Sequence, residues 1–169
     1  MNFLTTLETG GFASWIRESP SVWAYPFIIF LHAAGLSLVV GLSAVIDLAV
    51  LGFAPGVELA PMEKLYRIIG AGFWINLASG LLLALIDATT MLVNPLFWIK
   101  MALVGLAVAD VLVIKKLVFQ DPFPDKRPLP PKVRALAVAS LVLWMGAITA
   151  GRLTAYLGPV NIGPGIAAR

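Results

Sequence analysis

The chain alternates long apolar stretches with short polar connections. The apolar stretches cover about residues 22–53, 65–93, 96–119 and 133–157. Each is longer than the roughly 20 residues with which a helix crosses a bilayer, so each is predicted to be a transmembrane helix. The pair Asn94-Pro95 makes the second connection so short that the two middle helices must run antiparallel. The pattern therefore predicts an all-α fold, an integral membrane four-helix bundle in which residues 1–169 form a single domain.

Composition supports a membrane protein and excludes several functions. Of the 169 residues, 60% are hydrophobic and only 12% are charged, too few to cover the surface of a soluble domain. Because the chain has no cysteine, it forms no disulfide, no thiolate metal site and no covalent attachment to c-type haem. Its single histidine and five scattered methionines do not make a Cu(I) site. A nucleic-acid partner is not expected, because the basic loop is short and tied to a membrane.

The distribution of basic residues predicts the orientation in the membrane. The first and third connections, with their flanks, carry eight of the 12 basic residues. These eight are Lys64, Arg67, Lys115, Lys116, Lys126, Arg127, Lys132 and Arg134. By the positive-inside rule both connections are cytoplasmic, and both termini lie on the non-cytoplasmic side.

The sequence also predicts where the N-terminal segment and two tryptophans lie relative to the bilayer. Segment Asn2–Arg17 can form a short amphipathic helix along the outer interface, but its Gly10-Gly11 pair weakens the helix, and a soluble flexible tail is the alternative. Trp74 and Trp144 lie deep within their helices, and both are expected to pack in the core.

The rare ionisable residues of the apolar stretches are the candidates for function. His32 lies about ten residues, or roughly 15 Å, inside the first helix. An ionisable side chain at that depth is costly and usually faces a bundle interior, a partner or a cofactor. His32 is therefore either a core histidine bonded to a neighbouring helix, or a haem ligand or proton carrier. Lys100 and Arg152 lie on the same side, where they either extend to the interface or neutralise a carboxylate, that of Asp87 or of a ligand.

Two aspartates lie in the other half of the bundle. Asp47 in the first helix and Asp110 in the third are nearer the cytoplasmic basic residues. They are expected to be structural partners of Lys115, of Arg67 or of backbone groups, with membership of a proton relay as the alternative.

Stripes of small residues predict where the helices touch. Gly72, Asn76 and Gly80 recur every four residues in the second helix, which allows close backbone approach and one interhelical hydrogen bond. In the first helix the corresponding stripe is Ala33, Ser37 and Gly41. Asn76 is the most informative of these residues, because a buried amide needs a partner and can also contact a ligand.

Several segments together carry a resemblance to a known family. They are LHAAGLSLVVG at 31–41, the Asp-Leu pair at 47–48, NPLFWIKM at 94–101 and SLVLWMGAITAGRLTAY at 140–156. Together they resemble an uncharacterised bacterial family of four-helix membrane proteins, and the resemblance implies a multi-pass protein of the bacterial inner membrane. More distantly, the early histidine and the lysine opening the third helix are similar to those of the copper-resistance D proteins and the haem-containing protoporphyrinogen oxidase. That similarity implies that His32 is a haem ligand and matches Lys100 to the family's lysine.

Two classes of function follow from these observations. The first is a redox-linked membrane protein that binds haem b or a quinone at a site of His32, Lys100, Arg152 and Asn76, with His32 as the metal ligand. Because the chain has no second histidine, a haem would be five-coordinate, have a non-histidine sixth ligand, or be completed by His32 of a second protomer. The second class is a non-catalytic membrane subunit, or a lipid-binding or assembly protein, of a larger complex.

Overall fold

The computed structural model describes residues 10–19, 21, 23–120 and 129–157, and every regular element in this part of the chain is helical. The elements are α2 (Gly11–Glu18), α3 (Tyr25–Leu51), η1 (Ala60–Lys64), α4 (Leu65–Ile86), α5 (Ala88–Met91), α6 (Pro95–Phe119) and α7 (Pro131–Leu157). The expected all-α fold is thereby confirmed.

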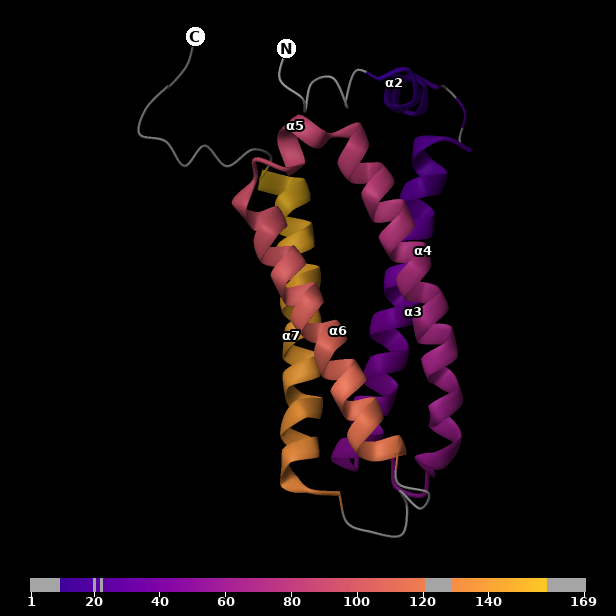
Figure 1. Ribbon diagram of the computed structural model, residues 1–169, viewed down its shortest axis with the longest axis vertical. Coiled ribbons are helices and arrows are strands. Elements are labelled where there is room, and N and C mark those ends of the chain that lie inside the picture. Colours follow the sequence, from indigo (N-terminus) through magenta and orange to yellow (C-terminus); the bar gives the residue numbers. More distant parts are fainter. Residues whose placement is uncertain (1–9, 20, 22, 121–128, 158–169) are drawn as a thin grey trace, which may run out of the picture.

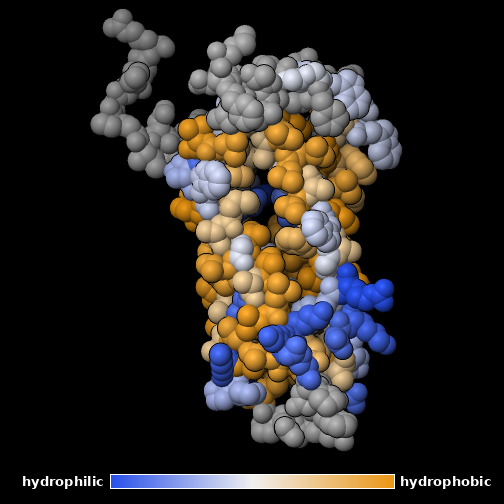
Figure 2. Space-filling model, in the orientation of Figure 1, coloured by the Kyte–Doolittle hydropathy of each residue, from blue (hydrophilic) through white to orange (hydrophobic). Residues whose placement is uncertain are grey.

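Four of these helical segments are long and apolar enough to cross a membrane. They are Tyr25–Leu51, Ala60–Ile86, Pro95–Phe119 and Pro131–Thr154. Their outward faces carry large apolar side chains, which colour most of the flank of the molecule in Figure 2. Such an apolar flank suits contact with lipid and not with water. The chain is therefore a multi-pass membrane protein.

The four long helices pack as two pairs (Figure 1). α3 packs mainly against α4, and α6 packs mainly against α7. The pairs join chiefly through α3 and α7, whereas α4 and α6 make few direct contacts. α2 and α5 lie at one end of the bundle, which we name the α5 end, and the opposite end is the η1 end.

Local backbone chemistry sets most of the helix ends. α3 stops at Gly52, whose φ of 89° is a left-handed conformation that glycine adopts without strain. α6 starts at Pro95, where the side chain of Asn94 accepts a hydrogen bond from the Leu96 amide at 2.9 Å.

The predicted second helix, 65–93, is wrong at its C-terminal end. α4 stops at Ile86 because Asp87 has φ −121° and ψ 41°, and the chain then turns into the short helix α5. The other predicted boundaries, 22–53, 96–119 and 133–157, agree with α3, α6 and α7 to within three residues.

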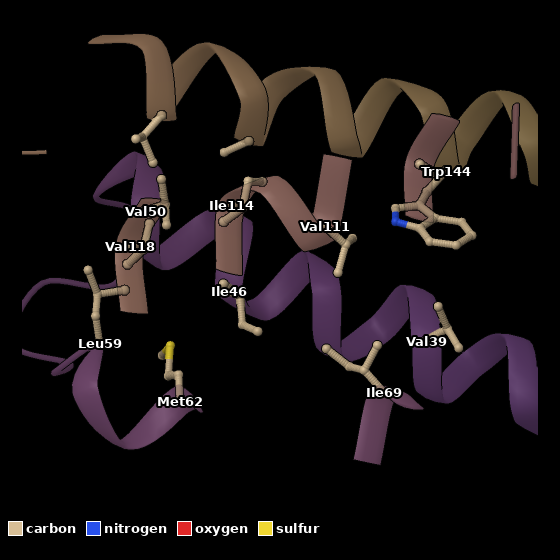
Figure 3. Close-up of a cluster of buried hydrophobic side chains, with 13 residues drawn as sticks. Val39, Ile46, Val50, Leu59, Met62, Ile69, Val111, Ile114, Val118 and Trp144 are labelled. Atoms are coloured by element: carbon tan, nitrogen blue, oxygen red, sulfur yellow. The ribbon is translucent and has the colours of Figure 1, made fainter. Parts of the chain in front are cut away.

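The main apolar core lies in the half of the bundle towards the η1 end (Figure 3). Val39 and Ile46 of α3 meet Ile114 of α6 and Trp144 of α7 there, and each is at most 4% exposed. Trp144 is thus buried as expected. Trp74 is 67% exposed, so its predicted place in the core is wrong.

The N-terminal segment forms a helix in its second half. Of the range Asn2–Arg17, residues 2–9 lie outside the described part, and the remainder includes the start of α2 at Gly11. Ile16 is buried in a small cluster with Ile28 and Ile86, while Trp15 is 62% exposed. One face of α2 therefore covers the α5 end of the bundle, as expected of an amphipathic helix and not of a flexible tail.

Candidate ligand site at His32

His32 lies on the face of α3 that packs against α4. Its ring nitrogen Nδ1 is 3.1 Å from the main-chain oxygen of Asn76 and 3.3 Å from the hydroxyl of Ser79. The side-chain amide of Asn76 in turn donates to the main-chain oxygen of His32 at 2.8 Å. The imidazole is half-buried and is tied to the neighbouring helix through one edge.

The neighbours of Nδ1 assign its proton. The main-chain oxygen of Asn76 can only accept a hydrogen bond. The Ser79 hydroxyl has two main-chain acceptors for its one proton, the carbonyl oxygens of Ile75 at 2.6 Å and Asn76 at 3.1 Å, so towards His32 it also accepts. The Asn76 amide nitrogen is farther from Nδ1, at 3.4 Å. Nδ1 is therefore assigned the ring proton, and in the neutral imidazole Nε2 then carries the free lone pair.

Small residues allow this close approach of α3 and α4. A Cβ atom added to Gly72 would lie 2.8 Å from Cβ of Leu38 and 3.1 Å from the Gly35 carbonyl oxygen. A Cβ added to Gly80 would lie 2.9 Å from Cε1 of His32. The predicted contact stripe of the second helix, Gly72, Asn76 and Gly80, is thus confirmed.

The predicted stripe of the first helix is wrong. Ala33, Ser37 and Gly41 are exposed, and a Cβ on Gly41 would meet nothing within 4 Å. The contact residue of α3 is instead Gly35, where a Cβ would lie 2.7 Å from the main-chain nitrogen of Asn76. Small residues occur on two faces of this helix, and the sequence does not distinguish them.

Lys100 brings α6 and α7 to the same region. A Cβ atom added to Gly151 of α7 would lie 3.6 Å from Cδ and 3.5 Å from Cε of Lys100. The alkyl chain of Lys100 therefore crosses α7 at a position where that helix has no side chain. The ammonium is close enough to His32 for an electrostatic interaction with the imidazole. Figure 2 shows the face hollowed in this half of the bundle, with hydrophilic residues at the bottom of the hollow.

Arg152 and Asp87 are placed elsewhere. Arg152 is exposed, and its guanidinium donates to the Tyr156 hydroxyl at 2.6 Å and lies over the same ring. Asp87 is at the junction of α4 and α5, close enough to Tyr25 for an electrostatic interaction. The structure therefore joins His32, Asn76 and Lys100, adds Ser79, and turns Arg152 to the surface. Ser79 was missed because a serine in an apolar helix commonly bonds to its own backbone.

A second polar group lies in the η1 half of the bundle. Asp47 and Asp110 are 2% and 8% exposed, and one carboxylate oxygen of each has no hydrogen-bond partner among the described residues. Ser140 is fully buried beside Asp47, without a hydrogen bond of good geometry. Lys115, an expected partner, lies instead over the ring of Tyr66, 5.3 Å from its centroid.

The site has one imidazole and no further strong metal ligand. Within the described ranges, no three His, Cys, Asp or Glu side chains gather as a metal-ion site. A haem iron differs from a bare ion because its porphyrin supplies the equatorial ligands, and one protein imidazole is enough to hold it. Comparison of the chain with protein-family models, curated proteins and solved structures gives no match.

Proposed function

We propose that this is a redox-linked integral membrane protein in which Nε2 of His32 ligates the iron of haem b. The observation that supports this is the hydrogen bond from Nδ1 to the Asn76 carbonyl oxygen. Histidine ligands of metals commonly donate their other ring N–H to a carbonyl or carboxylate, which fixes the tautomer and the ring orientation. The same tautomer disfavours a quinone bonded to His32, because an unprotonated Nε2 has no hydrogen to give to a quinone carbonyl.

The neighbouring residues have separate roles in this proposal. Asn76 and Ser79 hold the imidazole, and Gly80 leaves room for its edge. Lys100 supplies the positive charge that a haem propionate needs at membrane depth. Arg152, which belongs to the site expected from the sequence, instead donates to Tyr156 at the surface. A bound haem would supply one-electron transfer.

The cellular setting is part of the proposal. We place the protein in the bacterial inner membrane with both termini on the non-cytoplasmic side, so that His32 lies in the outer half of the bilayer. The basic residues at the η1 end support this orientation, since this end is then cytoplasmic. With one histidine per chain, a bis-histidine haem requires a homo-oligomer or a subunit of a larger membrane complex.

The visible spectrum of the purified protein tests the function. We expect a Soret band after growth with added haem precursor, and we expect His32→Ala to abolish it while the helical circular dichroism is unchanged. Ser37→Ala is the matched control, because Ser37 is on the exposed face of the same helix and bonds only within it, to the Ala33 carbonyl. This variant should keep the full band.

Two results would contradict haem ligation by His32. A Soret band that survives in His32→Ala would place the iron on another ligand. A colourless wild-type protein would favour the alternative, a non-catalytic membrane subunit or a lipid-binding or assembly protein. Lys100→Ala should loosen haem retention without changing the wavelength of the band, because a propionate partner does not touch the iron.

A further inference from the structure

A partly open cavity of about 250 Å³ lies between α4 and α6 in the η1 half of the bundle. The residues that line it are mostly apolar, and they include the aromatic side chains Tyr66, Phe73 and Trp144. It occurs between one helix of each pair, and these two helices, α4 and α6, make few direct contacts. At about 30 Å³ for a water molecule, the cavity has room for roughly eight waters, or for one planar ring system.

One wall of the cavity holds a hydrogen-bond donor that has no acceptor. Trp144 is only 3% exposed, and its Nε1 has no partner among the residues that the structure describes. In Figure 3 this nitrogen is on the side of the indole nearest Val111, which also lines the cavity. A buried donor without an acceptor is costly, so an acceptor brought by a ligand would be bound favourably.

The other polar groups of the cavity lie at the end of the cavity that is nearest the η1 end of the bundle. Lys115 is four residues from the end of α6 and lies over Tyr66. From Lys115 the cavity extends along α6 to Val108, seven residues or about 10 Å deeper. Trp144 is on α7, 13 residues or about 20 Å from the start of that helix and near the middle of its membrane-spanning segment.

This depth distinguishes between two kinds of lipophilic ligand. The acyl chain of a phospholipid fits the apolar walls, but its ester carbonyls remain near the headgroups and cannot reach the bilayer centre. A quinone carries carbonyl acceptors on a flat apolar ring, and its tail can stay in the lipid through the gap between α4 and α6. We infer that this cavity is a binding site for the ring of a lipid-soluble quinone, with a ring carbonyl accepting a hydrogen bond from Trp144 Nε1. The inference does not depend on haem at His32.

Photolabelling can locate such a ligand directly. The probe is a short-tailed azido-ubiquinone, added to the full-length protein in nanodiscs of phosphatidylcholine, and the labelled peptides are mapped by mass spectrometry. We expect labelling of α4 around Tyr66–Phe73 and of α6 around Val108–Lys115, with loss of labelling when unlabelled decylubiquinone competes. His32→Ala should leave this labelling unchanged, which keeps the result separate from the haem proposal.

Three variants make the test specific. Trp144→Phe keeps the ring but removes the donor, and it should raise the competitor concentration needed for half-displacement about tenfold, the effect of one buried hydrogen bond. Gly70→Leu should abolish labelling, because Gly70 lines the cavity and a Cβ there meets nothing within 4 Å. Gly105→Leu is its matched control, since Gly105 is equally open but is an exposed α6 residue that does not line the cavity.

Several outcomes would overturn the inference. They are absence of specific labelling in the wild type, labelling at other helices, labelling that persists in Gly70→Leu, and a half-displacing competitor concentration that is unchanged in Trp144→Phe. Native mass spectrometry can give a further outcome that would contradict a quinone site. A phospholipid that co-purifies with the wild type, is lost in Gly70→Leu and is not displaced by decylubiquinone would show that the cavity holds a lipid chain.

Discussion

Asn76 holds both the backbone and the side chain of His32. Its side-chain amide donates to the His32 carbonyl oxygen at 2.8 Å, and its own carbonyl oxygen accepts from Nδ1 of the His32 ring at 3.1 Å. These reciprocal bonds cross from α4 to α3 beside the close contact of Gly35 with Gly72. They make Asn76 a positioning residue for the imidazole, whatever ligand Nε2 receives.

The hydrogen bond made by the Asn76 side chain can be removed without removing the one accepted by its main-chain oxygen. Asn76→Ala should lower the free energy of unfolding in detergent by about 1 kcal/mol, the typical value of one hydrogen bond between membrane helices. The bond from Nδ1 to the carbonyl of residue 76 remains, so haem should be retained at reduced occupancy. Thermal unfolding followed by circular dichroism measures the first effect, and the ratio of Soret to protein absorbance measures the second.

Ser37→Ala again provides the comparison, because Ser37 lies on the exposed face of α3 and bonds to its own helix. If Asn76→Ala unfolded at the same temperature as Ser37→Ala, the bond to the His32 carbonyl would contribute nothing measurable.

The contact between α3 and α4 should not tolerate a larger residue at Gly72. Gly72→Leu adds a side chain whose Cβ alone would lie 2.8 Å from Cβ of Leu38, so the two helices must separate. We expect a loss of about 1–3 kcal/mol, the usual cost of overpacking, measured as a lower midpoint of thermal unfolding in detergent.

Gly41→Leu makes the same change at a position of α3 where a Cβ has open space. It should leave the unfolding temperature unchanged or raise it, because glycine is a poor helix former. Equal destabilisation by the two variants would mean that the α3–α4 contact does not limit stability.

The sequence predicts the helices well because their apolar length is a physical requirement of the bilayer. It predicts less well which face of a helix meets its neighbour. In a soluble protein the apolar face is the buried one, but in α3 the lipid-facing residues Phe30 and Val45 are as apolar as the buried Val39. Periodicity therefore cannot choose between Gly35 and the predicted stripe of Ala33, Ser37 and Gly41.

At the candidate site, too, the sequence predicts some features and not others. Asn76 was predicted as a contact because an amide inside an apolar helix needs a partner. Its contact with His32 could not be predicted, since that depends on the relative position of α3 and α4. Arg152 was expected at the site from its depth alone, yet Tyr156, one helical turn later, provides it with a partner at the surface. The break of α4 at Asp87 had no glycine or proline to mark it.

The orientation can be tested with a reporter that fluoresces only in the cytoplasm. The described basic residues of the first and third connections lie at the η1 end, and Lys126 and Arg127 lie outside the described part. The positive-inside rule predicts that this end is cytoplasmic. A reporter fused after Arg169 should therefore stay dark, while one fused after Gln120, directly following α6, should fluoresce. Fluorescence after Arg169 with none after Gln120 would reverse the orientation and put His32 in the inner half.

The buried pair Asp47 and Asp110 gives a stability prediction of unusual sign. An Asp47→Asn side chain keeps the shape of Asp47, removes its charge and brings N–H donors to a layer where a carboxylate oxygen of Asp110 lacks a partner. Since buried charge and unpaired acceptors are costly, this variant should be more stable than the wild type by about 1 kcal/mol, or about 2–4 °C. Glu58→Gln, in an exposed connection, is the matched control and should change nothing. If Asp47→Asn instead melted well below both, the carboxylate would be charged and paired in the folded protein, with a bound cation as its counter-charge.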